Sequence, residues 1–324
     1  MARPGRASLL ARLAVSVGLL ALLVALVDRP RLTARLAGAD PRFLLWVVAL
    51  ATADRLLMAW KWWLLIRGRE AAVSLWAAIR AYYLGSFAGY FLPMTVGADA
   101  VRVAALSGGG RTAGLIASVL LERTVGALAQ AVLATVSLAM LIGLGLGARI
   151  GPAQRWALGG VVVAAFLAFP FSFRVAAWAA GRLAASGGFP AKLGALAAAY
   201  ARYAASAGLV VVFFGLTLVE GAFPVMIHYA AGRALGLDPG WTFYVATVPL
   251  VFLVARLPVS LGGLGFLELS FVSLAGFLGV GWTDAFAIAG LATALYLLAL
   301  APGAVLYLVP ATAPVAARPR ERVP

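Results

Sequence analysis

Six stretches of the chain are long and apolar enough to cross a lipid bilayer as helices, and this feature decides the fold class. The hydrocarbon core of a bilayer is about 30 Å thick and is spanned by about 20 residues of α-helix. Only 11% of the residues are charged, whereas a soluble domain has about 25%. We therefore predict an all-α, polytopic membrane protein, with spans at residues 9–27, 43–66, 113–146, 156–173, 206–231 and 284–309.

Other apolar segments are too short or too interrupted for ordinary spans. Residues 75–92 carry Arg80, and residues 241–255 and 264–280 are separated by a Pro/Gly break. Such segments are typical of broken or re-entrant helices. The Ala-rich stretch 174–203 has basic residues along it and is predicted to be an interfacial helix or hairpin. The total is about eight spans with one or two re-entrant or broken helices.

The ends of the chain suggest its domain organisation and orientation. Arg3 and Arg6 precede the first apolar run as in a signal peptide, but no convincing cleavage site precedes Asp28, so an uncleaved span is favoured. Both ends are basic, which predicts that both termini are cytoplasmic. The basic residues of the loop 29–42 conflict with that orientation. We expect one membrane domain, residues 1–311, followed by a disordered basic tail, residues 312–324.

Residue types that the chain lacks exclude several functions. There is no cysteine, and His228 is the only histidine, so thiolate or histidine metal centres and most hydrolytic triads are excluded. The net charge of +15 comes from arginines scattered between apolar runs, and a basic face for nucleic acid is not evident. We expect no cofactor, no metal and no nucleic-acid partner, and the sequence leaves homodimer formation open.

Charged residues inside apolar helices are the best markers of a site, because they are costly at membrane depth and usually face a cavity or a partner. Asp54 and Lys61 lie on nearly the same helix face but two turns apart, too far to pair directly. We expect Lys61 to reach the membrane interface, and the same role is open for Asp54 and Arg55. Glu220 has no cationic neighbour in sequence, so it needs either a partner in space or a raised pKa that leaves it neutral. His228 is predicted to be a packing or interfacial residue.

Two pairs of oppositely charged residues lie on neighbouring segments. Pro93 ends one helix, and Asp99 and Arg102 then follow three residues apart, where they can pair on one turn. Either this acid only stabilises the helix start, or the loop presents Arg102 to an anionic group. Glu122 and Arg123 open the next long apolar helix. They are predicted to be buried against another helix, as a structural ion pair, or to face a wet cavity.

A glycine-rich break at residues 257–268 is the clearest local feature. Pro258, Gly262 and Gly263 interrupt a helix, and an apolar helix resumes at Glu268. Free backbone N–H groups at a new helix start favour an anion such as a phosphate head group, and Ser260 could add a hydroxyl donor. Close packing of helices through the glycines is the alternative.

Three motifs in order resemble those of the lysylphosphatidylglycerol synthase transmembrane family. They are Tyr82–Arg102, Ala117–Arg123 and Pro258–Glu268. The family includes stand-alone flippase-like proteins and the membrane half of the bacterial multiple peptide resistance factor. The resemblance covers roughly residues 43–309. It does not extend to the aminoacyl-transferring soluble domain of the resistance factor. It implies re-entrant helices around a lipid-accessible cavity, with expected polar residues Asp99, Arg102, Glu122, Arg123 and Glu268.

The resemblance implies a function, namely translocation of a phospholipid or other polar lipid across the bacterial inner membrane, without enzymatic activity. The family commonly has Arg before the Glu of the third motif, where this chain has Leu267; either an anionic lipid is bound differently here, or Arg256 supplies the charge. Two alternatives stay open. One is a non-transporting accessory subunit, and the other is a membrane glycosyl or lipid transferase, which would lack the usual Asp-x-Asp metal motif.

Overall fold

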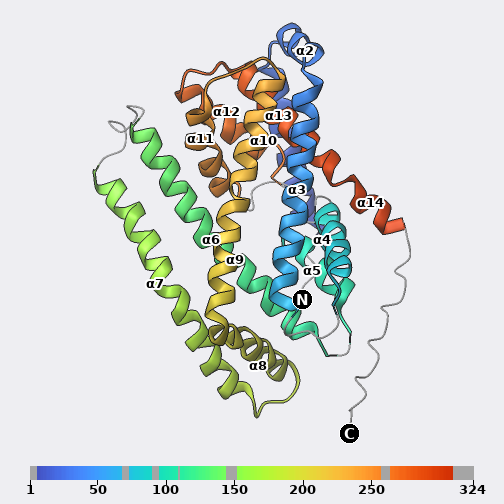
Figure 1. Cartoon of the computed structure of the whole chain (residues 1–324), viewed down its shortest axis with the longest axis vertical. Coiled ribbons are helices and arrows are strands. Elements are labelled where there is room, and N and C mark those ends of the chain that lie inside the picture. Colours follow the sequence, from blue (N-terminus) through green and yellow to red (C-terminus); the bar gives the residue numbers. More distant parts are fainter. Residues whose placement is uncertain are drawn as a thin grey trace.

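The computed structural model describes residues 6–67, 73–89, 95–108, 110–143, 152–256 and 263–308. Within these ranges every regular element is a helix (Figure 1), as predicted. The predicted tail 312–324 lies outside them. The α-helices are α1 (Arg6–Ala25), α2 (Arg29–Ala37), α3 (Pro41–Ile66), α4 (Leu75–Gly89), α5 (Thr95–Leu106), α6 (Thr112–Gly143), α7 (Pro152–Leu183), α8 (Gly188–Ala201), α9 (Ala207–Glu220), α10 (Ala222–Ala234), α11 (Trp241–Val254), α12 (Phe266–Phe277), α13 (Trp282–Ala299) and α14 (Ala301–Leu308).

The long helices confirm a multi-pass membrane protein. Five helical segments of the described chain are long and apolar enough to cross a bilayer, or six if α1 and α2, which are bent by 92°, form one span. Four of the five lie in α3, α6, α7 and the run Gly188–Ala234, and the fifth is Trp282–Leu308. The short apolar helices account for the difference from the expected total of about eight.

The segment predicted as a basic loop, residues 29–42, contains helix α2 and the start of α3. Asp28 caps α2 by accepting a hydrogen bond from the Arg31 amide at 3.0 Å. Asp40 caps α3 in the same way, from the Arg42 amide at 2.8 Å. A proline in the first turn of each helix needs no hydrogen-bond partner for its nitrogen. These caps stop the chain at one end of the bundle and turn it back as α3.

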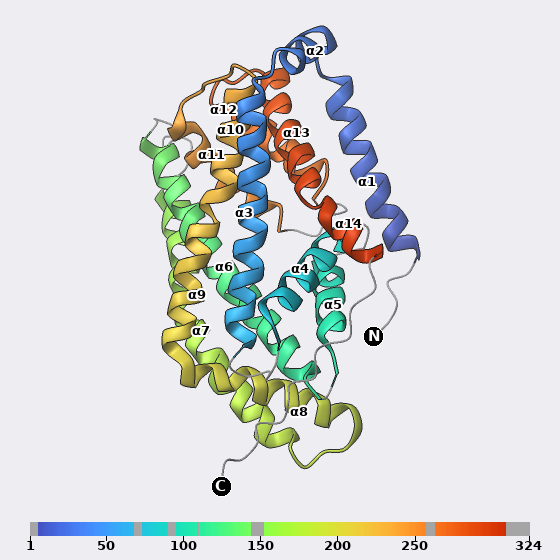
Figure 2. The same ribbon diagram turned by 45° about the vertical axis from the view of Figure 1, so that its right-hand side comes forward.

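Helices α4 and α5 form a short hairpin, in the region where residues 75–92 were predicted to be a broken or re-entrant helix. A helix of 15 residues, the length of α4, rises only about 22 Å, and the chain enters and leaves in the same half of the molecule (Figure 2). The two helices approach closely through glycines. A Cβ atom on Gly85 would lie 2.6 Å from the Ala98 carbonyl oxygen, and one on Gly89 would lie 2.6 Å from Ala98 Cβ. Only glycine permits this contact.

Helices α11 and α12 form a second short antiparallel pair in the opposite half of the molecule (Figure 1). Gly265 precedes α12 with a φ of +78° and packs on α1, where an added Cβ would lie 2.8 Å from Leu19 Cβ. The positive φ and the close contact together require glycine at this position. Residues 263–265, the described part of the predicted break, therefore lead directly into the second helix of this pair.

The order of elements occurs twice, in opposite directions. The first set is α3, the α4–α5 hairpin and α6. The second is the α9–α10 span, the α11–α12 hairpin and α13, and it runs the other way along the long axis (Figures 1 and 2). One cluster of buried apolar side chains lies within the first set, and a larger one joins the second set to α1 and to the first half of α3. Transporters with inverted repeats have this arrangement, with substrate sites between the repeats.

Helix α7 corrects one predicted boundary. A span was expected over 156–173 with an interfacial hairpin at 174–203, but α7 continues without a break to Leu183. Alanine has the highest helix propensity, and nothing in this Ala-rich sequence ends the helix at Arg174. The turn comes instead at residues 184–187, and α8 then begins at Gly188, which has a φ of +65°. Only α8, after that turn, corresponds to the predicted interfacial helix.

Candidate functional site

A cavity of about 600 Å³ lies between the two sets of helices. It is lined by α3 to α6 from the first set and by α9 to α13 from the second. Among the described residues, five acidic and five basic side chains line it, so their formal charges cancel. They are Asp54, Arg55, Lys61, Asp99, Arg102, Glu122, Arg123, Glu220, Arg256 and Glu268. The predicted site residues that the structure describes are therefore brought together around one space.

Arg102 on α5 is the centre of a buried ion network. Its Nη2 atom lies 2.9 Å from Asp99 Oδ1 and 2.6 Å from Glu122 Oε2. The Tyr82 hydroxyl donates to Glu122 Oε1 at 3.0 Å. The Arg102 guanidinium also lies 4.9 Å from the ring centroids of Trp62 and Tyr82, which are favourable cation–π distances. The Asp99–Arg102 pair predicted from the sequence is confirmed.

The expectation that Arg102 is presented to an anion stays a prediction, because the carboxylates that Arg102 contacts belong to the chain itself. Its residue is only 4% exposed, and two carboxylates of the chain already neutralise its charge. Arg123 is the more open of the two α5–α6 cations, with 44% of its side chain exposed. Its Nη2 atom lies 2.8 Å from Asp99 Oδ2. Glu122 and Arg123 therefore hold α6 to α5, as expected if they have a structural role. The ion pairs that do so join each of them to a residue of α5, Arg102 for Glu122 and Asp99 for Arg123.

Lys61 does not reach the interface, contrary to prediction. Its side chain is 1% exposed and forms an ion pair with Glu220 of α9. Its Nζ atom also donates to Thr217 Oγ1 at 3.1 Å and lies 5.0 Å from the Phe213 ring centroid. The predicted partner in space for Glu220 is thus Lys61. A lysine side chain extends to the membrane interface when no anion lies closer. Here Glu220 of α9 is a closer anion.

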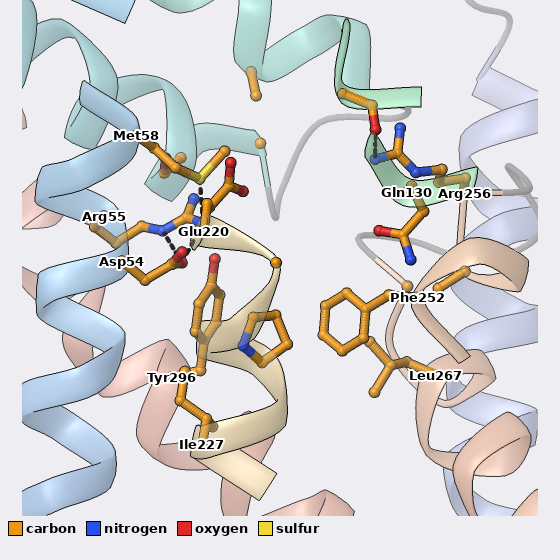
Figure 3. A pocket seen from close by; sticks show the side chains of 18 of the residues that line it. Asp54, Arg55, Met58, Gln130, Glu220, Ile227, Phe252, Arg256, Leu267 and Tyr296 are labelled. Carbon is orange, nitrogen blue, oxygen red and sulfur yellow. Dashed lines mark hydrogen bonds and ion pairs between the residues drawn. The ribbon is translucent and has the colours of Figure 1, made fainter. Parts of the chain in front are cut away.

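Asp54 and Arg55 also lie inside the bundle, so an interfacial role is wrong for both. Arg55 Nη2 lies 2.7 Å from Asp54 Oδ2, and the guanidinium lies 5.1 Å from the Tyr296 ring centroid. Figure 3 shows this pair with Met58 and Glu220 on one side of the cavity. This wall contains two ion pairs, each joining charges that would be costly alone at this depth.

The start of α12 does not offer a free anion site. Glu268 is 2% exposed. Its Oε2 atom accepts from the Gly265 amide at 2.7 Å, and its Oε1 atom accepts from Thr293 Oγ1 at 2.6 Å. The chain's own carboxylate therefore occupies the helix start that was predicted to bind a phosphate. Gly263 lines the cavity with a φ of +84°.

The predicted site residues Ser260 and Gly262 lie outside the residues that the structure describes.

Arg256 lies on the opposite wall from Asp54 and Glu220 (Figure 3). It follows the end of α11, and its Nη2 atom donates to the Gly126 carbonyl of α6 at 3.0 Å. Gln130, one turn further along α6, donates from Nε2 to the Pro249 carbonyl of α11 at 2.6 Å. Both bonds join α6 to α11 beside the cavity.

Aromatic and hydroxyl side chains complete the site, and sequence reasoning missed most of them as site residues. Tyr82, Thr217, Thr293 and Tyr296 all line the cavity and contact its charged groups. Tyr82 begins the first motif, which was the available signal. The others lie in apolar helices, where nothing local distinguishes them. His228 is buried between Phe252 and Phe271 with Nδ1 2.7 Å from the Pro224 carbonyl, as a packing residue would be.

Comparisons with known proteins identify the chain at family level. No curated protein and no solved structure matches it. A sequence model described as the lysylphosphatidylglycerol synthase TM region matches residues 9–303, which includes all three motifs and every described residue of the cavity wall. The chain therefore belongs to the lysylphosphatidylglycerol synthase transmembrane-region family.

Proposed function

We propose that the protein moves a phospholipid or other polar lipid between the two leaflets of the bacterial inner membrane. The observation that carries this proposal is the charged but formally neutral cavity between two half-length hairpins that enter from opposite ends. A polar head group crossing the hydrocarbon core needs polar partners. Acyl chains need an apolar surface, which Phe252, Leu267 and Ile227 provide in the same cavity (Figure 3).

The two hairpins suggest how the cavity opens. In transporters with inverted repeats, one repeat rocks or gates against the other around a fixed site. Here, within the described chain, three hydrogen bonds join α6 of the first set to α11 and to Arg256, which follows it: Arg256–Gly126, Gln130–Pro249 and Ser137–Val245. Movement of one hairpin at a time would expose the cavity to one side and then the other.

Lipid movement in reconstituted vesicles tests the proposal. Purified protein in vesicles of phosphatidylglycerol and phosphatidylethanolamine, with a trace of fluorescent lipid, is expected to make inner-leaflet label accessible to an impermeant quencher faster than in protein-free vesicles. The panel should include glycerophospholipids, an aminoacylated lipid and a glycolipid. If no lipid of this panel moves faster than in protein-free vesicles, the protein is not a translocator, and the accessory-subunit alternative gains support.

We also propose an orientation in which the end of the molecule that carries α8 is cytoplasmic. Residues 174–202 contain several Arg and Lys residues and no acid, which is typical of a cytoplasmic segment. At the α2 end, by contrast, Arg31 and Arg35 both pair with Asp284. The predicted cytoplasmic termini fit the same orientation.

Single cysteines test this orientation without background, because the chain has no cysteine. Ala34→Cys on α2 and Ala195→Cys on α8 are both exposed positions. An impermeant maleimide is expected to label Ala34→Cys in intact cells and Ala195→Cys only after permeabilisation. The reverse pattern would invert the proposed orientation, and labelling of both from one side would contradict the placement of α2 and α8 at opposite ends.

A further inference from the structure

Arg256 differs from the other four basic residues that line the cavity. Arg55, Lys61, Arg102 and Arg123 each form an ion pair with a carboxylate. Within the described part of the chain, the one hydrogen bond of Arg256 goes to a carbonyl oxygen, and it pairs with no acid. Its side chain is exposed to the cavity. Arg256 is thus the basic residue of the cavity for which no described carboxylate lies at ion-pair distance.

The remaining acid does not offset this charge locally. Of the five carboxylates that line the cavity, Glu268 is the one without a basic partner in the described chain. It is buried and accepts hydrogen bonds from the Gly265 amide and the Thr293 hydroxyl. The formal neutrality of the cavity therefore conceals a separation of charge. Glu268 is a buried carboxylate whose hydrogen bonds come from neutral donors. Arg256 is an exposed guanidinium with five N–H donors, only one of which makes a hydrogen bond to the described residues.

The position of Arg256 adds a second cation. Gly126, which accepts its hydrogen bond, lies three residues after Arg123, and residues at this spacing share a face of a helix. Arg123 and Arg256 therefore lie on the same wall, and Arg123 keeps 44% of its side chain exposed while it pairs with Asp99. Two guanidinium groups facing one space suit an oxyanion, because arginine matches phosphate geometry with parallel N–H donors.

Apolar groups of the cavity lie beside this charge. Figure 3 shows Phe252 and Leu267 next to Gln130 and Arg256 on one side of the space. When the anionic group of a ligand binds Arg256, the adjoining part of the ligand therefore lies against an apolar surface. Such a ligand joins a phosphate to a hydrocarbon part, as a glycerophospholipid does, whereas free phosphate would leave the apolar surface unused.

We propose that Arg256 binds the phosphodiester of a lipid head group, with Arg123 as the neighbouring cation, and so selects lipids that carry a phosphate. This inference rests on the proposed function, since it assumes that the cavity admits a lipid. It assigns the anion-binding role to Arg256, in place of Arg102 and of the start of α12, which the chain's own carboxylates occupy.

Binding to the purified full-length protein in detergent tests this inference. The probes are dihexanoyl phosphatidylglycerol, dihexanoylglycerol, which lacks the phosphate, and inorganic phosphate. Arg256→Gln is expected to weaken phosphatidylglycerol binding by about tenfold or more, the usual range for a lost charged hydrogen bond, and to leave dihexanoylglycerol binding unchanged. Arg233→Gln is the matched control, because Arg233 is an exposed arginine that pairs with Asp238 outside the cavity wall.

Several results would overturn the inference. One is unchanged phosphatidylglycerol affinity in folded Arg256→Gln protein, and another is an equal loss for both lipids. Inorganic phosphate that binds as tightly as the phospholipid would assign the site to a free anion. A measurement on the wild type covers the case in which the variant does not fold. There the phospholipid should bind at least about tenfold more tightly than dihexanoylglycerol, and equal affinities would refute a phosphate site.

The vesicle assay separates this inference from the proposed function. Arg256-dependent binding without lipid movement would keep the phosphate site and refute translocation. Lipid movement with the same rate and the same lipid preference in wild type and Arg256→Gln would keep translocation and refute the phosphate site.

Discussion

Replacing Arg102 by leucine is expected to lower the free energy of unfolding by about 3–5 kcal/mol, the usual cost of removing one partner of a buried ion pair. The substitution leaves Asp99 and Glu122 close together without the guanidinium that lies between them at 2.9 and 2.6 Å. It also removes the cation–π contacts with Trp62 and Tyr82. Thermal and denaturant unfolding of the detergent-purified protein, followed by tryptophan fluorescence, would measure the loss.

Arg182→Leu is the matched control for this substitution. Arg182 also lies over a tryptophan, with its guanidinium 5.4 Å from the Trp178 ring centroid, but it is exposed. Its replacement is expected to change stability by less than about 1 kcal/mol. If the two substitutions lower the free energy of unfolding by similar amounts, the ion pairs of Arg102 contribute no more to stability than the contacts of an exposed arginine.

A triple variant, Asp99→Asn, Arg102→Leu and Glu122→Gln, separates charge from packing. It removes the carboxylate of Glu122, which Arg102→Leu leaves without an ion-pair partner among the described residues, and that of Asp99, which would keep only the partly exposed Arg123 as its partner. Buried ion pairs are often replaceable by neutral groups at little cost. The triple variant is therefore expected to regain a large part of the stability lost in Arg102→Leu. If it is no more stable than the single variant, lost packing rather than unpaired charge causes the effect.

The course of the chain could be predicted from the sequence because long apolar runs in a membrane have few alternatives. Even the two hairpins were indicated, since Leu75–Gly89 and Trp241–Val254 are too short to span the hydrocarbon core. The boundary of α7 was misplaced because basic residues such as Arg174 were given more weight than the helix propensity of the surrounding alanines. A charge near the membrane surface does not end a helix, and α7 ends only at Leu183, where the turn of residues 184–187 begins.

The contacts within the site were predictable only where they are local. Asp99 and Arg102 are three residues apart on one helix, and their pairing followed from that spacing. Lys61 and Glu220 are 159 residues apart, and no sequence pattern joins them. Both were recognised as unusual because each lies in an apolar run. Sequence could therefore find the charged groups of the cavity but could not show which of them neutralise one another.

The same limit explains why the predicted anion site changed. Arg102 and the start of α12 both looked suitable for a phosphate when taken one segment at a time. In the folded chain Arg102 contacts Glu122 from α6, and the start of α12 is occupied by Glu268. Arg256 had less support from its own sequence context, but it is the cavity cation without an acidic partner among the described residues. Whether a charged side chain of the cavity has an acidic partner can be decided only from all of its contacts in the folded chain.

Glu220→Gln is expected to destabilise the protein more than Lys61→Met, although both break the same ion pair. After Glu220→Gln, Lys61 keeps a charged side chain that is 1% exposed, with only neutral acceptors, the Thr217 hydroxyl and the amide oxygen of the introduced glutamine, in place of the carboxylate. After Lys61→Met, the carboxylate left behind is 21% exposed and faces the cavity, where water can reach it. We expect a loss of about 3–5 kcal/mol for Glu220→Gln and about 1–3 kcal/mol for Lys61→Met. Equal losses would contradict the difference in burial.

The double variant Lys61→Met, Glu220→Gln then separates a structural role of this pair from a role in lipid movement. Because neither charge is left unpaired, its stability is expected to return to within about 1–2 kcal/mol of the wild type. If the pair only holds α3 to α9, lipid movement in vesicles should return together with stability. If the open face of Glu220 contacts the passing head group, the folded double variant should still move lipid at least about tenfold more slowly than wild type. We expect the second result, because Glu220 has the most exposed side chain of the ion-paired carboxylates that line the cavity. Full recovery of transport would assign the pair to structure and restrict head-group binding to the opposite wall, where Arg123 and Arg256 lie.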